Sequence, residues 1–535
     1  MSEEIRTDYF IAGAGIAGIL LAGRLAASGR RVLLADQGPR FSEADRAGII
    51  RRIHRTLNDF ADYNDETDPA MVTPHTSAGE STETAPWSYQ RVYGVGGTAL
   101  HFDGIMIRPL AEDLQVRTLY GYGRDWPISY AELEPWLQQA EVEIGVAGGD
   151  DNPYAAPRSG PYPMPAHPFS YFDREICDPA LQKLGMTGHS SPRAIASRPY
   201  RGRSACRACR ACHFCPSGAR YSPDRVHAPL LDQQANVTLL PKVSVRRLET
   251  SADGGHIVAA HAVRIEDRAP VVVRAEHYIL ALGGVANPRL LMLSAHGKHH
   301  PAGLGNAGGQ LGRGFSDHFN LFATIDAGRH VGSRLGFETM ICEHARVRND
   351  RREQPGCILF PAPSIDWYPI GIDATAWGTR GDTLSLDEVR ASIPRMAGVY
   401  AMTELSGQGT LELDDGSRDA FGDPVAKVTM RLSDWDRRSI RAFGKLVPQL
   451  AEAMAARNAS EVYPLLNMGY HPSGATAMAT TPDAGVCDPD LKVFGLDNLF
   501  VVGNSVFPQM GANPPTLTIA ALALRLAARL QGRRS

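Results

Sequence analysis

A histidine and an asparagine near the C-terminal end of the chain each lie in a short turn that contains proline. His471 stands in the segment 469–474 (GYHPSG), and Asn513 stands in the segment 511–518 (GANPPTLT). An imidazole with a pKa near neutral can accept a proton from a hydroxyl group, and a carboxamide can donate a hydrogen bond to the same oxygen. Since each turn would hold its side chain rigidly, we predict that His471 is a catalytic base and Asn513 a hydrogen-bond donor to one substrate hydroxyl.

The first 36 residues show the pattern of a β-α-β unit that binds a dinucleotide. The segment 7–12 (TDYFIA) is typical of a strand, and the glycine motif 13–18 (GAGIAG) follows it. Apolar residues at helical spacing predict a helix over 19–28, and a second strand is predicted over 31–36 (RVLLAD). In this setting the glycine motif indicates a turn that places a helix N-terminus against a pyrophosphate.

Four residues of this unit are candidate cofactor ligands. Gly13 makes the tight turn, Gly15 lets the backbone approach the pyrophosphate, and Gly18 lets the helix and the strand pack closely. Asp36 ends the second strand, where a carboxylate suits a ribose diol. The spacing of these residues fits FAD and NAD equally well.

A second glycine-rich loop, 93–104 (YGVGGTALHFDG), leads to a family. Together with the first motif it resembles the glucose-methanol-choline (GMC) flavoprotein oxidoreductases, in which a Val-Gly-Gly-Ser/Thr loop passes over the flavin. Further similar motifs follow in the same order along nearly the whole chain: 278–291 (YILALGGVANPRLL), 311–318 (LGRGFSDH), the His471 turn and 498–508 (NLFVVGNSVFP). The resemblance decides for FAD as the cofactor, and it implies cofactor contacts from Gly96, Gly97, Thr98, His101, Val245 and Asn504. Val245 is included because the segment 236–245 (NVTLLPKVSV) resembles the family strand that hydrogen-bonds the adenine through its backbone.

Within this family the sequence is similar to the pyranose oxidases and to the bacterial glucose, gluconate and fructose dehydrogenases. Gly503 stands where many family alcohol oxidases have an acid, and Asn513 stands where many relatives have a second histidine. His101 falls where pyranose oxidases carry a histidine bonded covalently to the flavin, and other members keep that histidine without the bond. The resemblance implies that a secondary hydroxyl of a sugar or glycoside is oxidised to a carbonyl, with hydride transfer to flavin N5.

Two other activities stay open at this point. Some relatives use a redox-silent flavin in a lyase or an isomerase, and others oxidise alcohols that are not sugars. No motif decides whether O₂ or an electron-acceptor protein or quinone reoxidises the flavin.

The resemblance implies an α/β fold with two domains and a connection. A Rossmann-like FAD-binding domain, similar to that of p-hydroxybenzoate hydroxylase, is expected to be discontinuous and to comprise residues 1–115, 200–320 and 455–535. A connecting segment of helix and linker spans 116–199, and a substrate-binding domain spans 321–454. Short β-like runs predict an antiparallel sheet for this last domain, over 318–325, 398–405, 410–413 and 424–431.

Three further helices and one long loop are predicted outside these strands. Ser129 and Glu132 have the spacing of a capping box, which opens the first helix. The helices are expected over 129–144, 433–457 and 517–530, and a polar surface loop is expected over 61–90.

Four cysteines follow one another at a uniform spacing of three residues: Cys206, Cys209, Cys212 and Cys215. Zinc sites usually use two cysteine pairs that are well separated in sequence, so this run does not fit zinc well. It comes closer to the ferredoxin-type run that ends in Cys-Pro, although its last gap is one residue short. Bacterial sugar dehydrogenases of the family hold a three-iron cluster in a similar place, with a different spacing. An iron–sulfur cluster and a set of reduced thiols both stay open.

The composition describes a globular protein of more than one domain. The chain has 535 residues and a formal net charge of −3, which argues against a nucleic-acid partner because such a partner needs a basic face. No signal peptide and no segment long enough to span a bilayer is visible, and we expect a cytoplasmic enzyme. The expected partners are a small alcohol or sugar and an electron acceptor, and a homo-oligomer stays open.

Overall fold

The computed structural model describes residues 3–56, 74–79, 81, 83–89, 91–209, 212, 214–332, 337–348, 350–363, 387, 391–465 and 469–532. Within this part of the chain, the largest sheet has seven strands in the order β8-β2-β1-β11-β10-β9, with β21 paired to β11. The pairs β8–β2, β2–β1, β1–β11 and β11–β21 are parallel, and β10 pairs antiparallel with β11 and β9. The strands are β1 (Glu3–Ala12), β2 (Val32–Ala35), β8 (Val237–Leu240), β9 (Val243–Thr250), β10 (Ile257–Arg264), β11 (Pro270–Leu280) and β21 (Leu499–Val501).

The predicted β-α-β unit at the start of the chain is confirmed. Helix α1 (Ile16–Ala26) begins three residues earlier than expected, because Gly15 already has the extended backbone of an N-cap. Gly13 has a φ of +103°, and a Cβ at this position would lie 2.4 Å from the Ala281 carbonyl oxygen. A Cβ at Gly18 would lie 1.9 Å from the Gly13 carbonyl oxygen, so that the turn and the first helical turn can close only on glycine.

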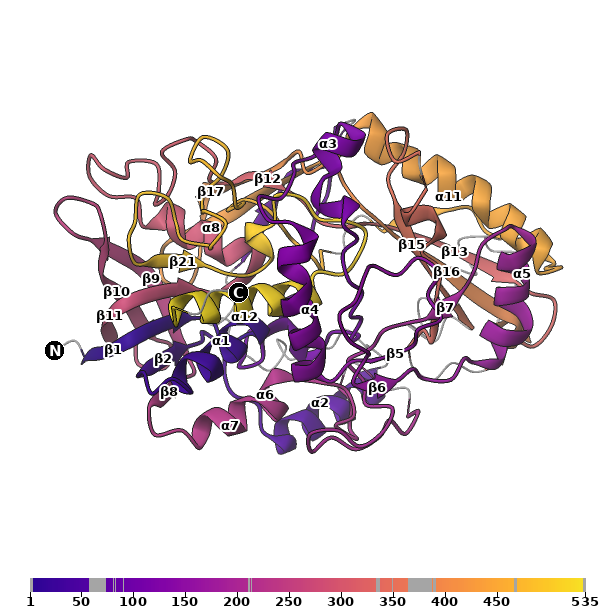
Figure 1. Cartoon of the computed structure of the whole chain (residues 1–535), viewed down its shortest axis with the longest axis horizontal. Helices are drawn as coiled ribbons and strands as arrows, with labels where there is room; N and C mark the ends of the chain where they lie inside the picture. Colours follow the sequence, from indigo (N-terminus) through magenta and orange to yellow (C-terminus); the bar gives the residue numbers. More distant parts are fainter. Residues whose placement is uncertain are drawn as a thin grey trace.

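Two helices from distant parts of the sequence cover this unit. Helix α12 (Thr516–Leu530) confirms the predicted buried helix, and it packs against α1 and against α4 (Tyr130–Ile144). Helix α4 begins at the predicted capping box, in which Ser129 and Glu132 bond to each other's backbone. Figure 1 shows α12 and α4 near the middle of the molecule, with the seven-stranded sheet to the left of α4 and the strands of one further sheet to its right.

Most of the remaining strands form two further sheets. One has the order β15-β16-β13-β19 with β20 on β13, and all its pairs are antiparallel. The other has the order β12-β17-β18-β3 with β4 on β18. The four predicted strands are therefore present but are divided between two sheets. The bounds are β12 (Arg313–Phe315), β13 (Phe319–Asp326), β15 (Cys357–Pro363), β16 (Met396–Thr403), β17 (Gly409–Arg418), β18 (Pro424–Arg431), β19 (Asn458–Ala459) and β20 (Tyr463–Leu465).

Three sequence-based expectations need correction. Helix α11 (Asp434–Ala453) ends before residue 457, because Ala455 takes a left-handed backbone (φ 55°) and the chain then enters β19. The expected strand over 236–245 is two strands, β8 and β9, separated by a turn at Lys242 with φ 58°. Part of the expected loop 61–90 is β3 (His75–Ser77) and β4 (Thr84–Ala85), which pair with β18, while residues 61–73, 80, 82 and 90 lie outside the described residues.

The other described helices and strands complete the fold. They are α2 (Glu43–Thr56), α3 (Val116–Tyr120), α5 (Asp178–Lys183), α6 (Pro223–Val226), α7 (Ala228–Asp232), α8 (Gly283–Leu293), β5 (Ala147–Gly148), β6 (Met164–Pro165), β7 (His189–Ser190) and β14 (Met340–Ile341), with 3₁₀-helices η3 (Gly97–Leu100), η4 (Glu112–Leu114), η6 (His344–Arg346), η8 (Ile393–Arg395) and η9 (Asn504–Val506) and a π-helical turn, η5 (Asp173–Cys177).

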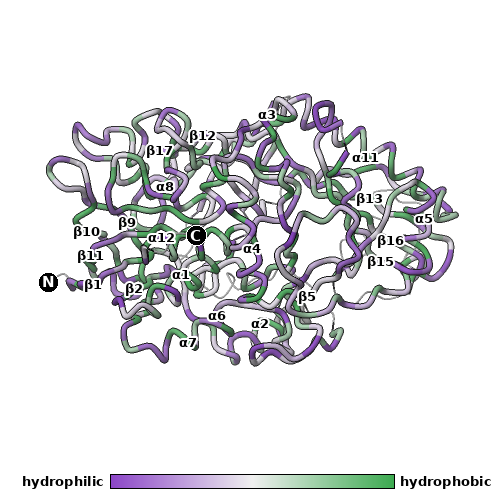
Figure 2. The backbone as a smooth tube through the Cα atoms, in the orientation of Figure 1, coloured by the Kyte–Doolittle hydropathy of each residue, from purple (hydrophilic) through white to green (hydrophobic). Residues whose placement is uncertain are grey.

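The described residues form two large apolar cores. One lies between the seven-stranded sheet and helices α1, α4 and α12, and the other lies between β13, β16 and α11. Figure 2 shows green, hydrophobic stretches along the inner strands and helices and more purple segments in the outer loops. The predicted α/β fold, with a Rossmann-like sheet and an antiparallel sheet beside it, is confirmed. None of the described helices combines the length and the apolar character needed to cross a bilayer.

Candidate active site

His471 lies in a turn that is fixed by the segment between β12 and β13. The backbones of Ser473 and Ser316 exchange hydrogen bonds of 2.7 and 3.0 Å. Gly474 has a φ of +76°, and a Cβ there would lie 2.0 Å from the Gly314 carbonyl oxygen. The turn therefore packs backbone against backbone, which leaves little freedom to the imidazole that precedes it.

His471 is hydrogen-bonded to a second histidine that the sequence placed in a motif without giving it a role. The Nδ1 atoms of His318 and His471 lie 2.8 Å apart, and the two rings are nearly perpendicular. The Nε2 atom of His318 lies 2.9 Å from the Gly511 carbonyl oxygen. Because Gly511 is two residues before Asn513, this pair of contacts connects the base predicted from sequence with the donor predicted from sequence.

These contacts determine which nitrogen of His471 is free of a proton. Burial lowers the pKa of His318 to about 4, so that this imidazole is neutral near pH 7 and carries one N–H. A carbonyl oxygen only accepts, so the proton of His318 is on Nε2 and its Nδ1 accepts a hydrogen bond. The donor to that Nδ1 is the Nδ1–H of His471. Neutral His471 thus has its lone pair on Nε2, the nitrogen that a general base needs.

The protonation of His471 is also shifted by its surroundings. Burial, and then the neighbouring His318, lower the pKa of His471 well below its usual 6.5, while Asp103 acts in the opposite direction. A histidine with a lowered pKa is neutral near pH 7 and is ready to accept a proton.

Asp317 is hydrogen-bonded to the backbone of both histidines. One carboxylate oxygen accepts hydrogen bonds from the backbone N–H groups of His318 (2.7 Å) and His471 (3.0 Å), and the other accepts from Trp87 Nε1 (3.0 Å). Burial raises the pKa of this carboxyl to about 7. Asp317, His318 and His471 offer ligand atoms close enough for a metal ion, but the carboxylate oxygens and both nitrogens of His318 already have hydrogen-bond partners. The cluster is therefore built as a hydrogen-bond network.

Asn513 is buried in the turn that precedes α12. Its Oδ1 accepts a hydrogen bond of 3.2 Å from Arg346 Nη2, and its Nδ2 lies 3.4 Å from the Pro514 carbonyl oxygen. Arg346 was not predicted from sequence, because an isolated arginine far from both catalytic turns carries no spacing signal. The structure thus connects Asn513 with His471 through His318 and Gly511, and it places the buried guanidinium of Arg346 against the Asn513 carbonyl.

The two glycine-rich loops meet at the end of β1. Gly96 donates its N–H to the Ala14 carbonyl oxygen at 2.7 Å, and the backbones of Gly15 and Gly96 pair as a β-bridge. A Cβ at Gly97 would lie 3.0 Å from the Cα of Gly15. This close approach favours glycine at positions 96 and 97, which both have a positive φ, and it forms a backbone cradle at the N-terminus of α1.

The other predicted cofactor residues lie at three places. Asp36 follows β2, and its carboxylate accepts hydrogen bonds from the N–H groups of Ala14 (2.8 Å) and Gly38 (2.9 Å). Val245 lies in β9 and pairs with Ala262. The remaining three follow the glycine loops or the last strand: Thr98 within η3, His101 at its C-terminal end, and Asn504, whose carbonyl accepts from the Gly474 N–H at 3.2 Å.

The cysteine run divides into buried and exposed members. Cys206, Cys212 and Cys215 pack in one small apolar cluster, whereas Cys209 is exposed. The Arg220 N–H donates to Cys215 Sγ at 3.1 Å, and the Ala208 N–H donates to Cys206 Sγ at 3.4 Å. Burial raises the pKa of the Cys206 and Cys212 thiols.

The buried side chain of Arg220 connects this cluster with the second glycine-rich loop. Its guanidinium donates to the carbonyl oxygens of Cys212 (2.7 Å), Ala99 (2.8 Å) and Leu100 (2.6 Å).

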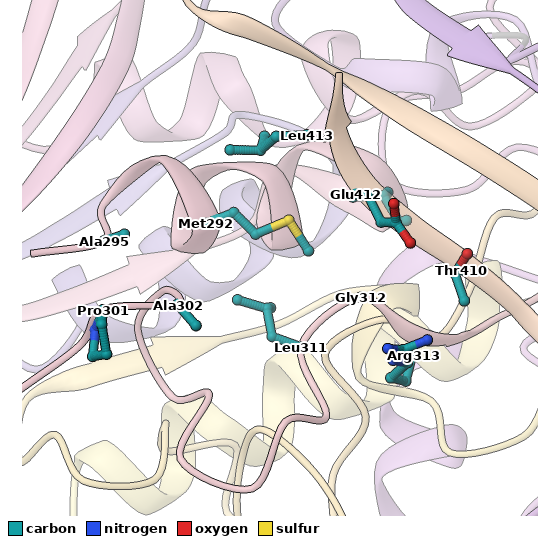
Figure 3. Close-up of a pocket in the computed structure, with 11 residues that line it drawn as sticks. Met292, Ala295, Pro301, Ala302, Leu311, Gly312, Arg313, Thr410, Glu412 and Leu413 are labelled. Atoms are coloured by element: carbon teal, nitrogen blue, oxygen red, sulfur yellow. The ribbon is translucent and has the colours of Figure 1, made fainter. Parts of the chain in front are cut away.

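A separate cavity of about 320 Å³ lies between α8 and β17. Figure 3 shows Met292 and Leu311 on its apolar side and Glu412 and Arg313 at its polar side. Its lining contains neither histidine nor cysteine. It is therefore distinct from the His471 cluster, although Gly312, in its wall, donates a hydrogen bond of 2.8 Å to the Ala475 carbonyl oxygen behind the catalytic turn.

Comparison with known proteins assigns this arrangement to a family. Two models that describe GMC oxidoreductases match residues 91–320 and 406–523. The fructose dehydrogenase large subunit of Gluconobacter japonicus is 30% identical over 543 residues, which cover 98% of this chain and 98% of that protein. The chain belongs to the GMC oxidoreductase family. Members bind FAD and act on alcohol groups, so this GMC oxidoreductase is a flavoprotein that oxidises alcohols.

Two further similarities extend over nearly the whole length of the chain. The GMC oxidoreductase is 26% identical to 2-methyl-1,2-propanediol dehydrogenase of Mycolicibacterium austroafricanum, covering 97% of this chain and 94% of the relative. The solved structure of pyridoxine 4-oxidase from Mesorbium loti is similar with a TM-score of 0.65 at 19% identity, covering 99% of this chain and all of that one. This last likeness shows a shared fold.

Proposed function

We propose that this GMC oxidoreductase oxidises a secondary hydroxyl of a sugar or glycoside to a ketone. The observation that carries the proposal is the contact between His318 and His471, because it leaves the lone pair of His471 on Nε2. The relative with 30% identity is named for fructose, which supports a sugar substrate. Asn513, as the partner of the base, supports the same branch of the family.

The residues present fit an FAD molecule. The backbone cradle formed by Gly15, Gly96 and Gly97 lies at the N-terminus of α1, where a pyrophosphate binds favourably, and a Cβ at Gly97 would narrow it, lying 3.0 Å from the Gly15 Cα. We propose Gly13, Gly15, Gly18, Gly96, Gly97, Thr98, His101, Val245, Asn504 and Asp36 as the residues that hold the cofactor. When bound, FAD supplies a hydride acceptor at flavin N5.

The two catalytic side chains act on one substrate oxygen. His471 Nε2 accepts the hydroxyl proton, and Nδ1–H remains bonded to His318 throughout, so the ring does not rotate as it becomes charged. The Asn513 amide donates a hydrogen bond to the oxygen on which negative charge develops. Loss of the proton lets the carbon release its hydride, because the electrons of the O–H bond form the carbonyl.

Mixing the enzyme with candidate alcohols in the absence of O₂ tests this proposal. Sugars or glycosides are expected to bleach the oxidised flavin, and His471→Ala is expected to retain FAD but to slow the bleaching by about 10²–10⁴-fold. A flavin that stays oxidised with every alcohol while substrate is consumed would instead indicate a redox-silent lyase or isomerase. Bleaching by simple diols but not by sugars would favour a non-sugar alcohol dehydrogenase, as the name of the M. austroafricanum relative suggests.

We further propose that the cysteine run holds an iron–sulfur cluster, with Cys206, Cys212 and Cys215 as ligands. Two buried thiols, Cys212 and Cys215, and the half-buried thiol of Cys206 pack in one apolar cluster, and two of the three accept backbone N–H groups. Thiol ligands and hydrogen bonds to sulfur are what iron–sulfur clusters use. Exposed Cys209 is left out of this ligand set. Protein purified without O₂ is expected to contain iron and acid-labile sulfide, and both should be lost in Cys212→Ser; iron-free, fully active protein would rule the cluster out.

A cluster favours a dehydrogenase that passes electrons to a protein or quinone rather than to O₂. The relative from Gluconobacter is named as the large subunit of its enzyme, which supports a protein acceptor. The rates at which O₂ and a soluble quinone reoxidise the reduced flavin distinguish a dehydrogenase from an oxidase. Faster reoxidation by the quinone is expected for a dehydrogenase. Release of all yellow colour on acid precipitation would exclude a covalent bond at His101.

A further inference from the structure

Arg346 approaches the predicted hydrogen-bond donor from inside the protein. Its side chain is 1% exposed, and its Nη2 donates to Asn513 Oδ1 at 3.2 Å. A guanidinium only donates hydrogen bonds, so the Asn513 atom that faces it must be the carbonyl oxygen. The amide NH₂ group therefore points away from Arg346.

We infer that Arg346 is a positioning residue, which fixes the amide of Asn513 so that its N–H, and not its carbonyl, faces the substrate oxygen. This inference rests on the proposed role of Asn513. The two ends of a carboxamide have nearly the same shape, and a rotation of half a turn exchanges a donor for an acceptor. An acceptor at this place would repel an alcohol oxygen that is losing its proton. The arginine thus selects the orientation that helps the reaction.

Arg346 is itself held by a buried network of charges. The same Nη2 also lies 2.5 Å from Asp113 Oδ2 and 2.9 Å from the Arg108 carbonyl oxygen, so its two hydrogens are shared among three acceptors. The other terminal nitrogen bonds to the Glu343 carboxylate. Asp113 and Glu343 are almost fully buried. Because carboxylates bind the guanidinium on two sides, it cannot swing away from Asn513 without leaving a buried charge unpaired.

The turn that carries Asn513 is shaped to fit this network. A Cβ at Gly511 would lie 2.9 Å from Asp113 Cγ and 3.0 Å from Asn513 Oδ1. Glycine at this position therefore lets the turn approach Asp113 and lets Arg346 reach the amide. The positive charge of Arg346 also contributes to the lowered pKa of His318, after burial. One buried cation thus acts on the donor and on the histidine that sets the tautomer of the base.

A double-mutant cycle on anaerobic flavin reduction by a sugar substrate tests the inference. Asn513→Ala is expected to slow reduction by about 10²-fold, and Arg346→Met by at least about tenfold. The double variant is expected to be no more than about threefold slower than Asn513→Ala alone, because both substitutions remove the same interaction. Arg351→Lys is the matched control: it disturbs the other oxygen of Asp113, 2.9 Å away, and is expected to lower thermal stability with a smaller loss of rate.

The outcomes separate the inference from the function it rests on. If the two single effects multiply in the double variant, Arg346 does not act through Asn513 and the inference is wrong. If Asn513→Ala reduces its flavin at the normal rate, the proposed function of Asn513 fails first. Should Arg346→Met lose its flavin or its fold, Arg346→Lys replaces it in the cycle, since this variant keeps the charge but cannot bridge Asp113, Glu343 and Asn513 together. If the rate losses of Arg346→Lys and Asn513→Ala multiply in their double variant, the inference is likewise wrong.

Discussion

His318 and His471 share a hydrogen bond between their Nδ1 atoms, at 2.8 Å, and His318 donates its only proton to the Gly511 carbonyl oxygen. The proton on His318 therefore dictates the tautomer of His471. This is a positioning function for a residue that does not need to touch the substrate.

The tautomer argument predicts different outcomes for two substitutions of His318. In His318→Leu the Nδ1–H of His471 loses its acceptor, and flavin reduction is expected to slow by about tenfold or more. A glutamine can accept from His471 with its carbonyl and donate to Gly511 with its amide, so His318→Gln is expected to keep most of the rate. Stopped-flow measurement of flavin reduction compares the two. Equal losses in both variants would contradict the tautomer role.

The lowered pKa of His471 predicts the pH dependence of flavin reduction. The base is active when neutral, and its pKa lies well below 6.5, mainly through burial and then through His318, against the opposite effect of Asp103. The rate is therefore expected to stay constant as the pH falls to 6.5 and to decrease only below it. Single-turnover rates across the acid range measure this limb. A limb centred above 6.5 would show that the imidazole is not shifted downward.

Asp317 predicts a pH dependence of stability. Burial raises its pKa from 3.8 to about 7, so the folded chain binds this proton more tightly than the unfolded chain does. The free energy of unfolding is then expected to decrease as the pH rises from about 4 to about 7, by at most about 1.4 kcal/mol per pH unit. Urea unfolding of the native protein and of Asp317→Asn at several pH values isolates this contribution. An identical slope in both proteins would assign it to other groups.

Two glycines offer a matched test of the catalytic turn. Gly474→Ala introduces a Cβ 2.0 Å from the Gly314 carbonyl oxygen at a positive φ, and it is expected to cost more than about 1 kcal/mol of stability and most of the activity. Gly444 lies exposed in α11 with nothing within 4 Å of an added Cβ. Gly444→Ala is expected to stabilise the protein by up to about 1 kcal/mol at unchanged activity. Thermal unfolding measures the stability of the two variants, and flavin reduction measures their activity. Equal effects of the two substitutions would contradict the close packing of the catalytic turn.

Much of the fold could be predicted from local signals. The strand, glycine motif and helix at the N-terminus form a continuous pattern, and the capping box at Ser129 and Glu132 fixes the start of α4 within a few residues. The division of the four predicted strands into two sheets could not be predicted, because strand pairing joins segments far apart and leaves no mark on either one.

The candidate site shows the same limit. His471 and Asn513 stand out because each lies in an unusual turn. His318 and Arg346 act through hydrogen bonds to residues 153 and 167 positions away, and nothing in their neighbouring sequence indicates these partners. The tautomer of His471 follows only when His318 and the Gly511 carbonyl are seen together.

Gly511 has one more consequence. Its carbonyl oxygen accepts a hydrogen bond from His318, and the absence of its side chain lets the turn approach Asp113 and lets Arg346 reach Asn513. The proton acceptor and the hydrogen-bond donor are therefore anchored to the same short piece of backbone and move together. The position of the reacting oxygen is therefore fixed by the backbone that carries both groups. In relatives built this way, a different substrate must be selected by the residues that line the rest of the pocket and not by the base or the donor.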